Sequence, residues 1–164
     1  MPIEPMDQPT KGRKRLAGIT GAGAAALLIA TVGHFEGKRN DPYLDIVKVR
    51  TVCYGETRVA MRHYTDAECD DMLADGLADF AAPVLARNPE LRGHDAQLAA
   101  AVSLAYNIGG ANYRKSTVAR RFSEGRWRAA CDAFLSWSYA GGRQVAGLLN
   151  RRKAERDICL RGVK

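Results

Sequence analysis

The sequence predicts a single α+β domain in which a small sheet lobe precedes a larger helical lobe. Strand signals are confined to residues 45–60. Apolar residues of the second half recur at helical spacing between capping residues and glycine stops. The 164 residues, 46% hydrophobic and 26% charged, suffice for one domain with a core and exclude a disordered, collagen-like or multidomain chain.

The net charge favours an anionic partner. Lys and Arg number 25 against 18 Asp and Glu, which gives +7 at pH 7, so nucleic acid, an acidic cell envelope and a membrane surface all fit on charge alone. Aromatic residues make up only 7% of the chain, too few for a platform that stacks single-stranded bases. Composition thus argues against such a platform and leaves the choice of anionic partner to other evidence; we expect no nucleic-acid partner.

The N-terminal region combines a basic cluster with an uncharged run. Lys11, Arg13, Lys14 and Arg15 precede residues 16–32, LAGITGAGAAALLIATV. As a helix this run covers about 25 Å, slightly less than the roughly 30 Å hydrocarbon core of a bilayer, and its glycines and alanines make it weakly hydrophobic. Positive charge on its N-terminal side predicts residues 1–15 as a cytosolic tail, with the chain after the run outside the membrane.

Three interpretations of residues 16–32 compete. The pattern AGA at residues 22–24 is typical of a signal-peptide cleavage site, but apolar residues 27–29 still follow it. A buried core helix suits the composition but leaves the neighbouring basic cluster unexplained. An uncleaved signal-anchor helix accounts for both features, and we favour it, with residues 33–164 as the folded domain.

Four cysteines indicate disulfide bonds in a chain that is expected to be exported. We favour sequential pairing, Cys53 with Cys69 and Cys131 with Cys159, because it closes two short loops. The alternative is four small core side chains. No spacing resembles CxxC and only three histidines are present, so we expect neither a metal site nor a cofactor.

The sheet lobe is expected directly after Glu36. Residues 37–45, GKRNDPYLD, read as a turn-rich segment. The β-branched alternation over residues 47–52, closed by Gly55, predicts a small hairpin or three-stranded sheet.

A long helix should begin at residue 65, because Thr65 and Glu68 have the spacing of a capping box. Its apolar positions, three and four residues apart, are Cys69, Met72, Leu73, Leu77, Phe80 and Val84. The acidic residues between them are Asp70, Asp71, Asp75 and Asp79. We expect those to form a solvated face rather than a metal site.

The remaining segments are expected to be helical. Asp95 can cap a helix that stops at Gly109 and Gly110, and Ser116 can cap a shorter one that stops at Gly125. Two further helices are predicted over residues 126–136 and 145–159.

Glu36, Asp45 and Thr51 are the candidate catalytic residues. Glycoside hydrolysis needs one protonated carboxyl group that donates to the leaving oxygen and one ionised carboxylate that activates water. Glu36 follows Val32 and Phe35 and suits the protonated role, whereas Asp45 follows a polar turn and suits the ionised role. Spacing alone also allows a capping glutamate and a turn aspartate.

The residues around this trio resemble a known family. The stretch from Glu36-Gly37 through Asp45 to VRTVCYG at residues 49–55 is similar to the catalytic segment of phage-type lysozymes, glycoside hydrolase family 24. The resemblance extends over residues 34–160. It includes YTDAEC at 64–69, AYNIG at 105–109, Ser116-Thr117, Trp137 before Gly141-Gly142, and GLLNRR at 147–152 followed by Glu155 and Cys159.

The resemblance implies a lysozyme-like fold with the active-site cleft between the two lobes. It makes Glu36 the general acid, Asp45 the second carboxylate and Thr51 the hydroxyl that helps to hold the attacking water. The family consists of inverting muramidases, which cut peptidoglycan between N-acetylmuramic acid and N-acetylglucosamine. A family arginine matches Arg151, which is expected to pair with Glu36; the alternative is a solvated surface arginine.

Weaker expectations concern the supporting residues. Asn107 either faces the glycan or caps a helix before Gly109, and Gln97 is a still weaker binding candidate. Glu56 departs from the family, which usually has histidine at that position, and adds a rival carboxylate. We expect the protein to be monomeric.

A domain of this family joined to a Gly/Ala-rich anchor resembles the signal-anchor-release endolysins of phages that infect Gram-negative hosts. This predicts a protein held in the host inner membrane through residues 16–32, N-terminus inside, that later escapes into the periplasm. Glu36 lies four residues beyond Val32, so an inserted helix keeps the acid at the membrane surface. Release is expected to let residues 16–32 refold beside the domain and bring Glu36 into the cleft.

Two other functions remain open. A lytic transglycosylase would need one catalytic glutamate and would leave an anhydro sugar. A non-enzymatic, basic envelope-binding protein would use only the positive charge.

Overall fold

The uncharged run forms two helices in a computed structural model, which describes residues 11–164 of the chain. Helix α1 covers Lys11–Thr20 and α2 covers Ala22–Glu36, bent by 118° with Gly21 between them at φ +90°. That backbone conformation favours glycine. No single helix of the described residues is long and apolar enough to cross a membrane, although the bent pair together has the length and composition. In this structure the run of residues 16–32 is thus divided between α1 and α2, and the anchor helix expected in a membrane stays a prediction.

Both helices contribute to the core instead. Leu16 of α1 and Leu28 and Val32 of α2 are fully buried, in one apolar cluster with residues of α3 and α4. The core-helix interpretation thus describes this structure. The end of the basic tail, residues 11–15, belongs to α1, and the remainder of the tail lies outside the described residues.

Helix α1 packs along α3, Asp66–Arg87. Arg15 donates through Nη1 to Asp75 Oδ1 at 3.0 Å and through Nη2 to Asp79 Oδ1 at 2.7 Å. The backbone N–H of Arg13 donates to Asp71 Oδ1 at 2.9 Å. The acidic face that was expected to be solvated therefore binds the basic end of α1.

The sheet lobe is an antiparallel hairpin of β1, Arg39–Leu44, and β2, Arg50–Cys53. Strand β1 falls in the segment expected to be a turn, so that expectation is wrong. The chain turns instead over residues 45–49, where Val47 is 70% exposed. A second small hairpin of β3, Tyr139–Ala140, and β4, Arg143–Gln144, was not expected; its two turn glycines both have positive φ.

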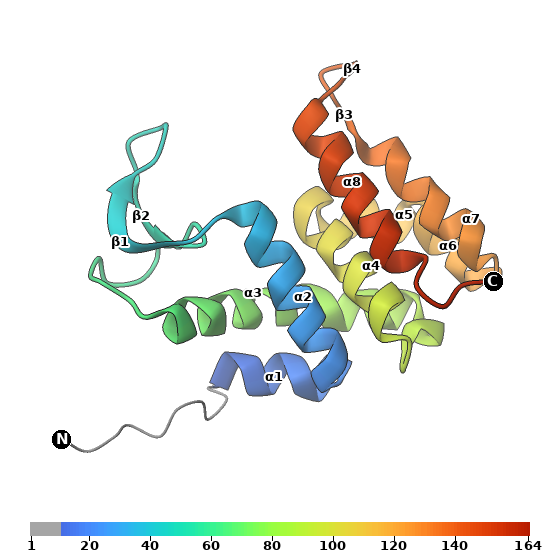
Figure 1. Ribbon diagram of the computed structural model, residues 1–164, viewed down its shortest axis with the longest axis horizontal. Coiled ribbons are helices and arrows are strands. Elements are labelled where there is room, and N and C mark those ends of the chain that lie inside the picture. The colour runs from blue at the N-terminus through green and yellow to red at the C-terminus, as the bar shows by residue number, and fades with distance from the viewer. Residues whose placement is uncertain (1–10) are drawn as a thin grey trace.

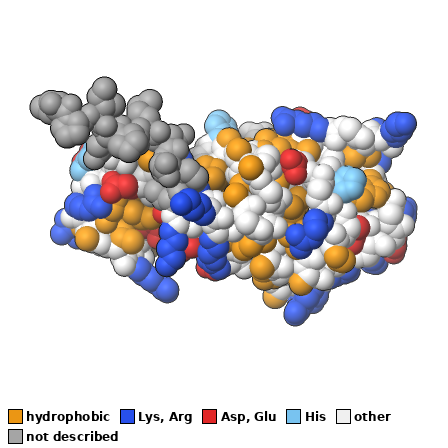
Figure 2. Space-filling view, turned by 90° about the horizontal axis from the view of Figure 1, so that it is seen from below, with side chains coloured by type: hydrophobic (Ala, Val, Ile, Leu, Met, Phe, Trp, Pro, Cys, Tyr) orange, Lys and Arg blue, Asp and Glu red, His pale blue; other side chains and the backbone are white. Residues whose placement is uncertain are grey.

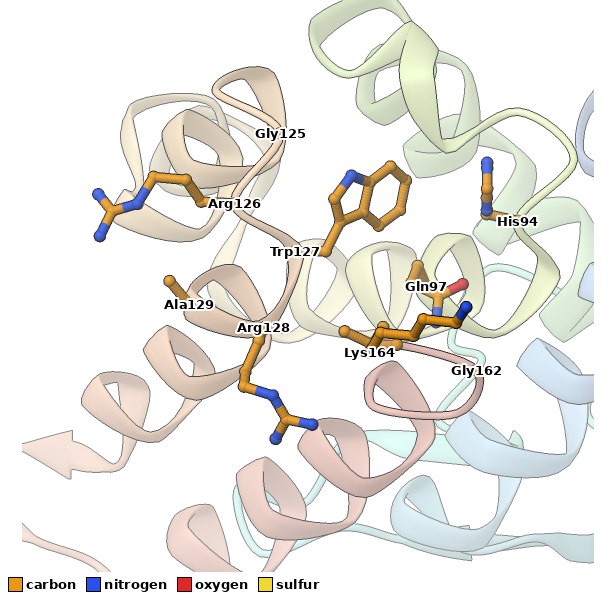
Figure 3. A pocket seen from close by; sticks show the side chains of 10 residues that line it. His94, Gln97, Gly125, Arg126, Trp127, Arg128, Ala129, Gly162 and Lys164 are labelled. Carbon is orange, nitrogen blue, oxygen red and sulfur yellow. The ribbon is translucent and has the colours of Figure 1, made fainter.

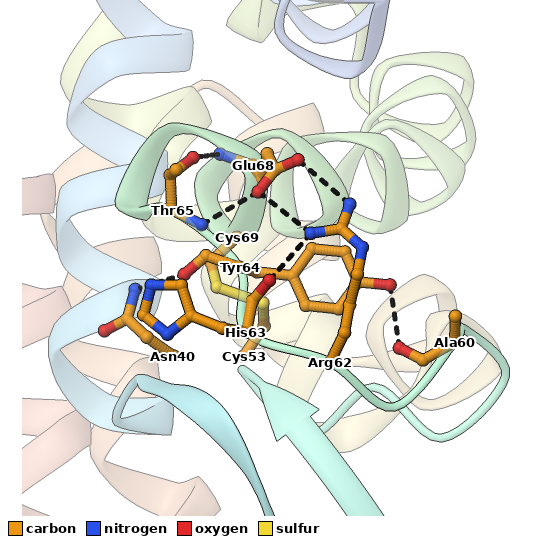
Figure 4. Close-up of polar contacts among 9 residues, drawn as sticks. All are labelled: Asn40, Cys53, Ala60, Arg62, His63, Tyr64, Thr65, Glu68 and Cys69. Carbon is orange, nitrogen blue, oxygen red and sulfur yellow. Dashed lines mark hydrogen bonds and ion pairs between the residues drawn. A yellow bond between two sulfur atoms is a disulfide. The ribbon is translucent and has the colours of Figure 1, made fainter.

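The capping box at the start of α3 is confirmed (Figure 4). Thr65 Oγ1 accepts from the Glu68 N–H at 3.2 Å, and Glu68 Oε2 accepts from the Thr65 N–H at 2.8 Å. The Arg62 guanidinium also donates to Glu68 and, together with the Thr65 amide, lowers the pKa of that carboxyl to about 2.

Both sequential disulfides are confirmed. Cys53–Cys69 joins β2 to the first turn of α3, and Cys131–Cys159 joins α7 to the end of α8. The first bridge attaches the hairpin lobe to the helix that runs beneath both lobes (Figure 1).

The helical lobe follows the predicted order with some differences. Its elements are η1 Pro89–Leu91, α4 Asp95–Ile108, α5 Gly110–Lys115, α6 Thr117–Ser123, α7 Trp127–Ala133, η2 Phe134–Trp137 and α8 Ala146–Cys159. Ser116 caps α6 as predicted, with its hydroxyl accepting from the Ala119 N–H. The predicted cap at Asp95 is wrong, because His94 is the N-cap and no side chain caps this end. Helix α5 was missed, since the chain turns at Gly109 and resumes a helix at once.

Figure 1 shows the β1–β2 hairpin at one side, α6, α7 and α8 at the other, and α2 between them. The end of α2 therefore lies where the two lobes meet.

Basic side chains spread from one end to the other of the face drawn in Figure 2, in keeping with the net charge of +7.

Candidate active site

Glu36 is the last residue of α2, and the burial of that helix fixes its position. Val32 and Leu28, one and two turns earlier, are fully buried, so the helix cannot rotate without exposing apolar surface. Gly37 then ends the helix at φ +72°, a conformation that favours glycine.

Arg151 of α8 meets Glu36, as expected. Its Nη1 lies 2.9 Å from Glu36 Oε1, and the exposed fractions of the two side chains are 8% for Arg151 and 28% for Glu36. The Arg151 guanidinium also lies over the ring of Phe35, 5.3 Å from its centroid. The alternative of a solvated surface arginine is wrong.

A buried polar network holds Arg151 from behind. Glu155 Oε1 accepts from Arg151 Nε at 3.2 Å, from Arg152 Nη2 at 3.1 Å and from the Ser103 hydroxyl of α4 at 2.6 Å. Glu155, Arg152 and Ser103 have no exposed surface. Burial raises the pKa of the Glu155 carboxyl, and the two guanidinium groups and the hydroxyl oppose that shift. Glu155 thus balances buried positive charge and fixes the orientation of Arg151.

Asp45 lies in the loop between β1 and β2 and is held by that loop. Its Oδ1 accepts from the N–H groups of Val47 at 2.9 Å and Val49 at 2.8 Å, the pattern of an Asx turn. Its other carboxylate oxygen has no hydrogen-bond partner among residues 11–164. One oxygen is therefore fixed and the second is free to bind water.

Thr51 is the second residue of β2 and is only 3% exposed. Its hydroxyl donates to the carbonyl of Val49 at 3.0 Å, and the N–H of Val49 binds Asp45. Thr51 and Asp45 are therefore linked through one residue, and the hydroxyl oxygen of Thr51 can still accept a hydrogen bond from water.

Tyr106 lies near both Glu36 and Glu56. A backbone bridge to Val52 fixes Glu56, and burial raises the pKa of its half-buried carboxyl. The pKa of the Tyr106 hydroxyl is raised first by burial and then by the negative charges of Glu36 and Glu56. The charge of Glu36 and that of the carboxylate at the position where the family usually has histidine thus both act on Tyr106.

Tyr54 connects the hairpin lobe to α2 and was not predicted from sequence. Its hydroxyl donates to Asp70 Oδ1 at 2.5 Å, and its ring lies against Gly33, where a β-carbon would be in tight contact with it. Burial and the Asp70 carboxylate raise the pKa of this phenol. Gly33 therefore allows α2 to approach the hairpin lobe one turn before Glu36.

The two weaker candidates have different outcomes. Asn107 is exposed at the end of α4 beside Tyr106, and the helix cap is Gly109, so its contact with glycan stays a prediction. Gln97 is wrong as a residue of this site. It lies nine residues before Tyr106 on the same helix, about 14 Å away, and its amide donates to the carbonyls of Cys159 and Arg161.

The structure shows two parts of the candidate site: Glu36 bound by Arg151, and Asp45 linked to Thr51 through Val49. In the described part of the chain, no cluster of His, Cys, Asp or Glu has the arrangement of a metal site. The sequence analysis assigned no role in the site to Ser103, Glu155 or Tyr54. Only Glu155 had a usable signal, its spacing of three and four residues from two arginines.

Comparison with known proteins gives consistent matches. The phage lysozyme family model matches residues 33–155. A SAR-endolysin of Enterobacteria phage P21 is 39% identical over 165 residues, covering 94% of this chain and 98% of that protein. The endolysin of Escherichia coli O157:H7 phage FAHEc1 has a similar fold, with TM-score 0.71, 24% identity and 96% of each chain covered. The muramidase domain of SpmX from Asticaccaulis excentricus aligns with TM-score 0.68 and 27% identity, covering 87% of this chain and 97% of that one.

Replacing Glu155 should cost the protein much of its stability. In Glu155→Ala two buried guanidinium groups lose their shared carboxylate, and we expect the free energy of unfolding to fall by about 3–5 kcal/mol in urea denaturation. Asp157→Ala, which removes an exposed carboxylate of the same helix, should change it by less than about 0.5 kcal/mol. If the two substitutions changed the free energy of unfolding equally, the buried network around Glu155 would not support the site.

Proposed function

The chain belongs to the phage lysozyme family and is an endolysin that degrades peptidoglycan, and we propose that it cuts the β-1,4 bond between N-acetylmuramic acid and N-acetylglucosamine by inverting hydrolysis. One observation carries the proposal. Glu36 is held by an arginine of α8, whereas Asp45 is held by loop amides with one oxygen free. The two carboxylates therefore have different surroundings, as a pair with different roles requires.

In the proposed mechanism Glu36 donates a proton to the glycosidic oxygen as the bond to it breaks. Asp45 accepts a proton from a water molecule, and the water oxygen attacks the anomeric carbon from the opposite face of the sugar. The Thr51 hydroxyl accepts a hydrogen bond from that water and helps to orient it. Once Glu36 carries its proton the ion pair with Arg151 is lost, and Glu155 remains as the counterion of Arg151.

The test is mass spectrometry, with reducing-end analysis, of purified peptidoglycan digested by the detergent-free protein. We expect reducing muramic acid ends from the parent. Glu36→Gln and Asp45→Asn should each lower their rate of formation at least about a hundredfold, because each removes a proton-transfer group. Glu56→Gln, which removes the carboxylate at the position where the family usually has histidine, should retain most of the activity.

Other outcomes identify the alternatives. Anhydro ends, with activity retained in Asp45→Asn, would contradict hydrolysis in favour of a lytic transglycosylase. A Glu36→Gln protein that behaves like the parent in every assay would contradict catalysis altogether and favour an envelope-binding protein.

We also propose that residues 16–32 hold the protein inactive in the host inner membrane, with the N-terminus inside, until release into the periplasm. The similarity to SAR-endolysins supports this. In the tethered state Leu28 and Val32 would face lipid and could not fill the domain core, so the helix that positions Glu36 would be missing from it. Gly21 allows one helix in the membrane and two in the domain.

The basic residues before the run act differently in the two states. In the membrane they keep the tail on the cytosolic side, and moving one charge against the potential costs about 2.3 kcal/mol per 100 mV. Depolarisation removes that cost. After release Arg15 pairs with Asp75 and Asp79 on α3, which favours the refolded state.

Gly12→Ala tests this refolding without altering residues 16–32. A methyl group at the buried Gly12 would overlap the backbone carbonyl oxygen of Asp71. We therefore expect it to lower the free energy of unfolding of the soluble protein by about 1–3 kcal/mol and to reduce the soluble periplasmic fraction after an uncoupler is added to expressing cells.

Gly18→Ala is a control for the unfolding measurement alone, because position 18 belongs to the run of residues 16–32. Position 18 has open space around it, so the substitution should stabilise α1 by about 0.5–1 kcal/mol. Normal release of a destabilised Gly12→Ala protein would contradict a role for α1 docking.

A further inference from the structure

A cavity of about 500 Å³ lies in the helical lobe, apart from the residues that bind Glu36. It is formed by the start of α4, the residues that lead into α7, and residues 162–164 after α8 (Figure 3). Gln97 at its wall lies about 14 Å along α4 from Tyr106. The cavity is therefore too far away to hold the sugar units that bind at the catalytic residues. A polymeric substrate could occupy both places only if a different portion of it entered the cavity.

The charge of the lining is positive. Arg126, Arg128 and Lys164 line the cavity, and no acidic residue among residues 11–164 does. Arg128 and Lys164 have no ion-pair or hydrogen-bond partner within residues 11–164, and Arg126 has a loose ion pair with Glu124 at 3.5 Å. Anionic groups are therefore the ligands that this lining favours.

The floor of the cavity offers an aromatic surface and a hydrogen-bond acceptor. The half-buried Trp127 lies against His94 with ring centroids 4.7 Å apart and packs edge-on against Phe122. Gln97 is 95% buried, and both of its amide hydrogen bonds use Nε2, which leaves the side-chain carbonyl oxygen without a donor in the described structure. That oxygen can accept a hydrogen bond from a ligand N–H.

Positive charge, an aromatic wall and a free acceptor together fit a peptide rather than a bare anion. A peptide supplies carboxylates for the cations, apolar groups for Trp127, and an amide N–H for Gln97. We propose that this cavity binds the acidic stem peptide of peptidoglycan and holds the enzyme on its substrate away from the cut bond. The choice of this peptide rests on the action of the protein on peptidoglycan.

The test is an NMR titration of the full-length, detergent-free protein with the free stem tetrapeptide, which contains no bond that a muramidase cuts. We expect shifted amide signals for His94, Gln97 and residues 125–129. The double variant Arg128→Gln/Lys164→Gln should bind the peptide about fivefold more weakly. Arg143→Gln, which removes an exposed charge outside the cavity, should bind like the parent.

A carboxyl-amidated peptide should also bind about fivefold more weakly, because it lacks the charges that the cations favour. Inorganic phosphate that shifts the same signals at equal concentration would overturn the peptide assignment and leave a general anion site. No shifts at the cavity, or equal binding by the double variant and the parent, would overturn the proposal. Formation of reducing ends is measured separately, so failure of either proposal leaves the other distinguishable.

Discussion

The burial of α2 is the constraint on which the rest of the site depends. Leu28 and Val32 fill the core of the helical lobe, and the same helix ends in Glu36. Glu36, the proposed catalytic acid, is therefore placed by the segment whose composition also suits a membrane. Any state in which residues 16–32 lie in lipid removes this segment from the core and leaves Glu36 without the packing that orients it.

The partners of Glu36 come from the far end of the chain. Arg151 reaches it from α8, and Glu155, Arg152 and Ser103 hold Arg151 in a region without exposed surface. Buried charges are costly unless they are paired and hydrogen-bonded. The network therefore fixes one arrangement of α4 and α8, and the ion pair with Glu36 adds α2 to it.

Local signals in the sequence were reliable. The capping box at Thr65 and Glu68 and the cap at Ser116 involve neighbouring residues, and the structure confirms both. Strand β1 was missed because its residues, RNDPYL, carry turn signals, and only pairing with β2 makes them a strand. The separation of Gln97 from the Glu36 site had no sequence signal, because its hydrogen-bond partners lie 62 and 64 residues away.

The candidate site depended on resemblance more than on local chemistry. The spacing of Glu36 and Asp45 does not distinguish a catalytic pair from a cap and a turn, and Asp45 does form a turn. The contact of Arg151 with Glu36 followed from the family pattern. The docking of α1 on the acidic face of α3 had no sequence signal, because its hydrogen bonds join residues about 60 positions apart.

The most direct test compares the muralytic activity of the full-length, detergent-free protein with that of a chain beginning at residue 33. If residues 16–32 build the site, the shortened chain has lost Leu16, Leu28 and Val32 from its core and should be inactive on purified peptidoglycan. If the run were only a tether, the shortened chain would be fully active, and that result would contradict the account.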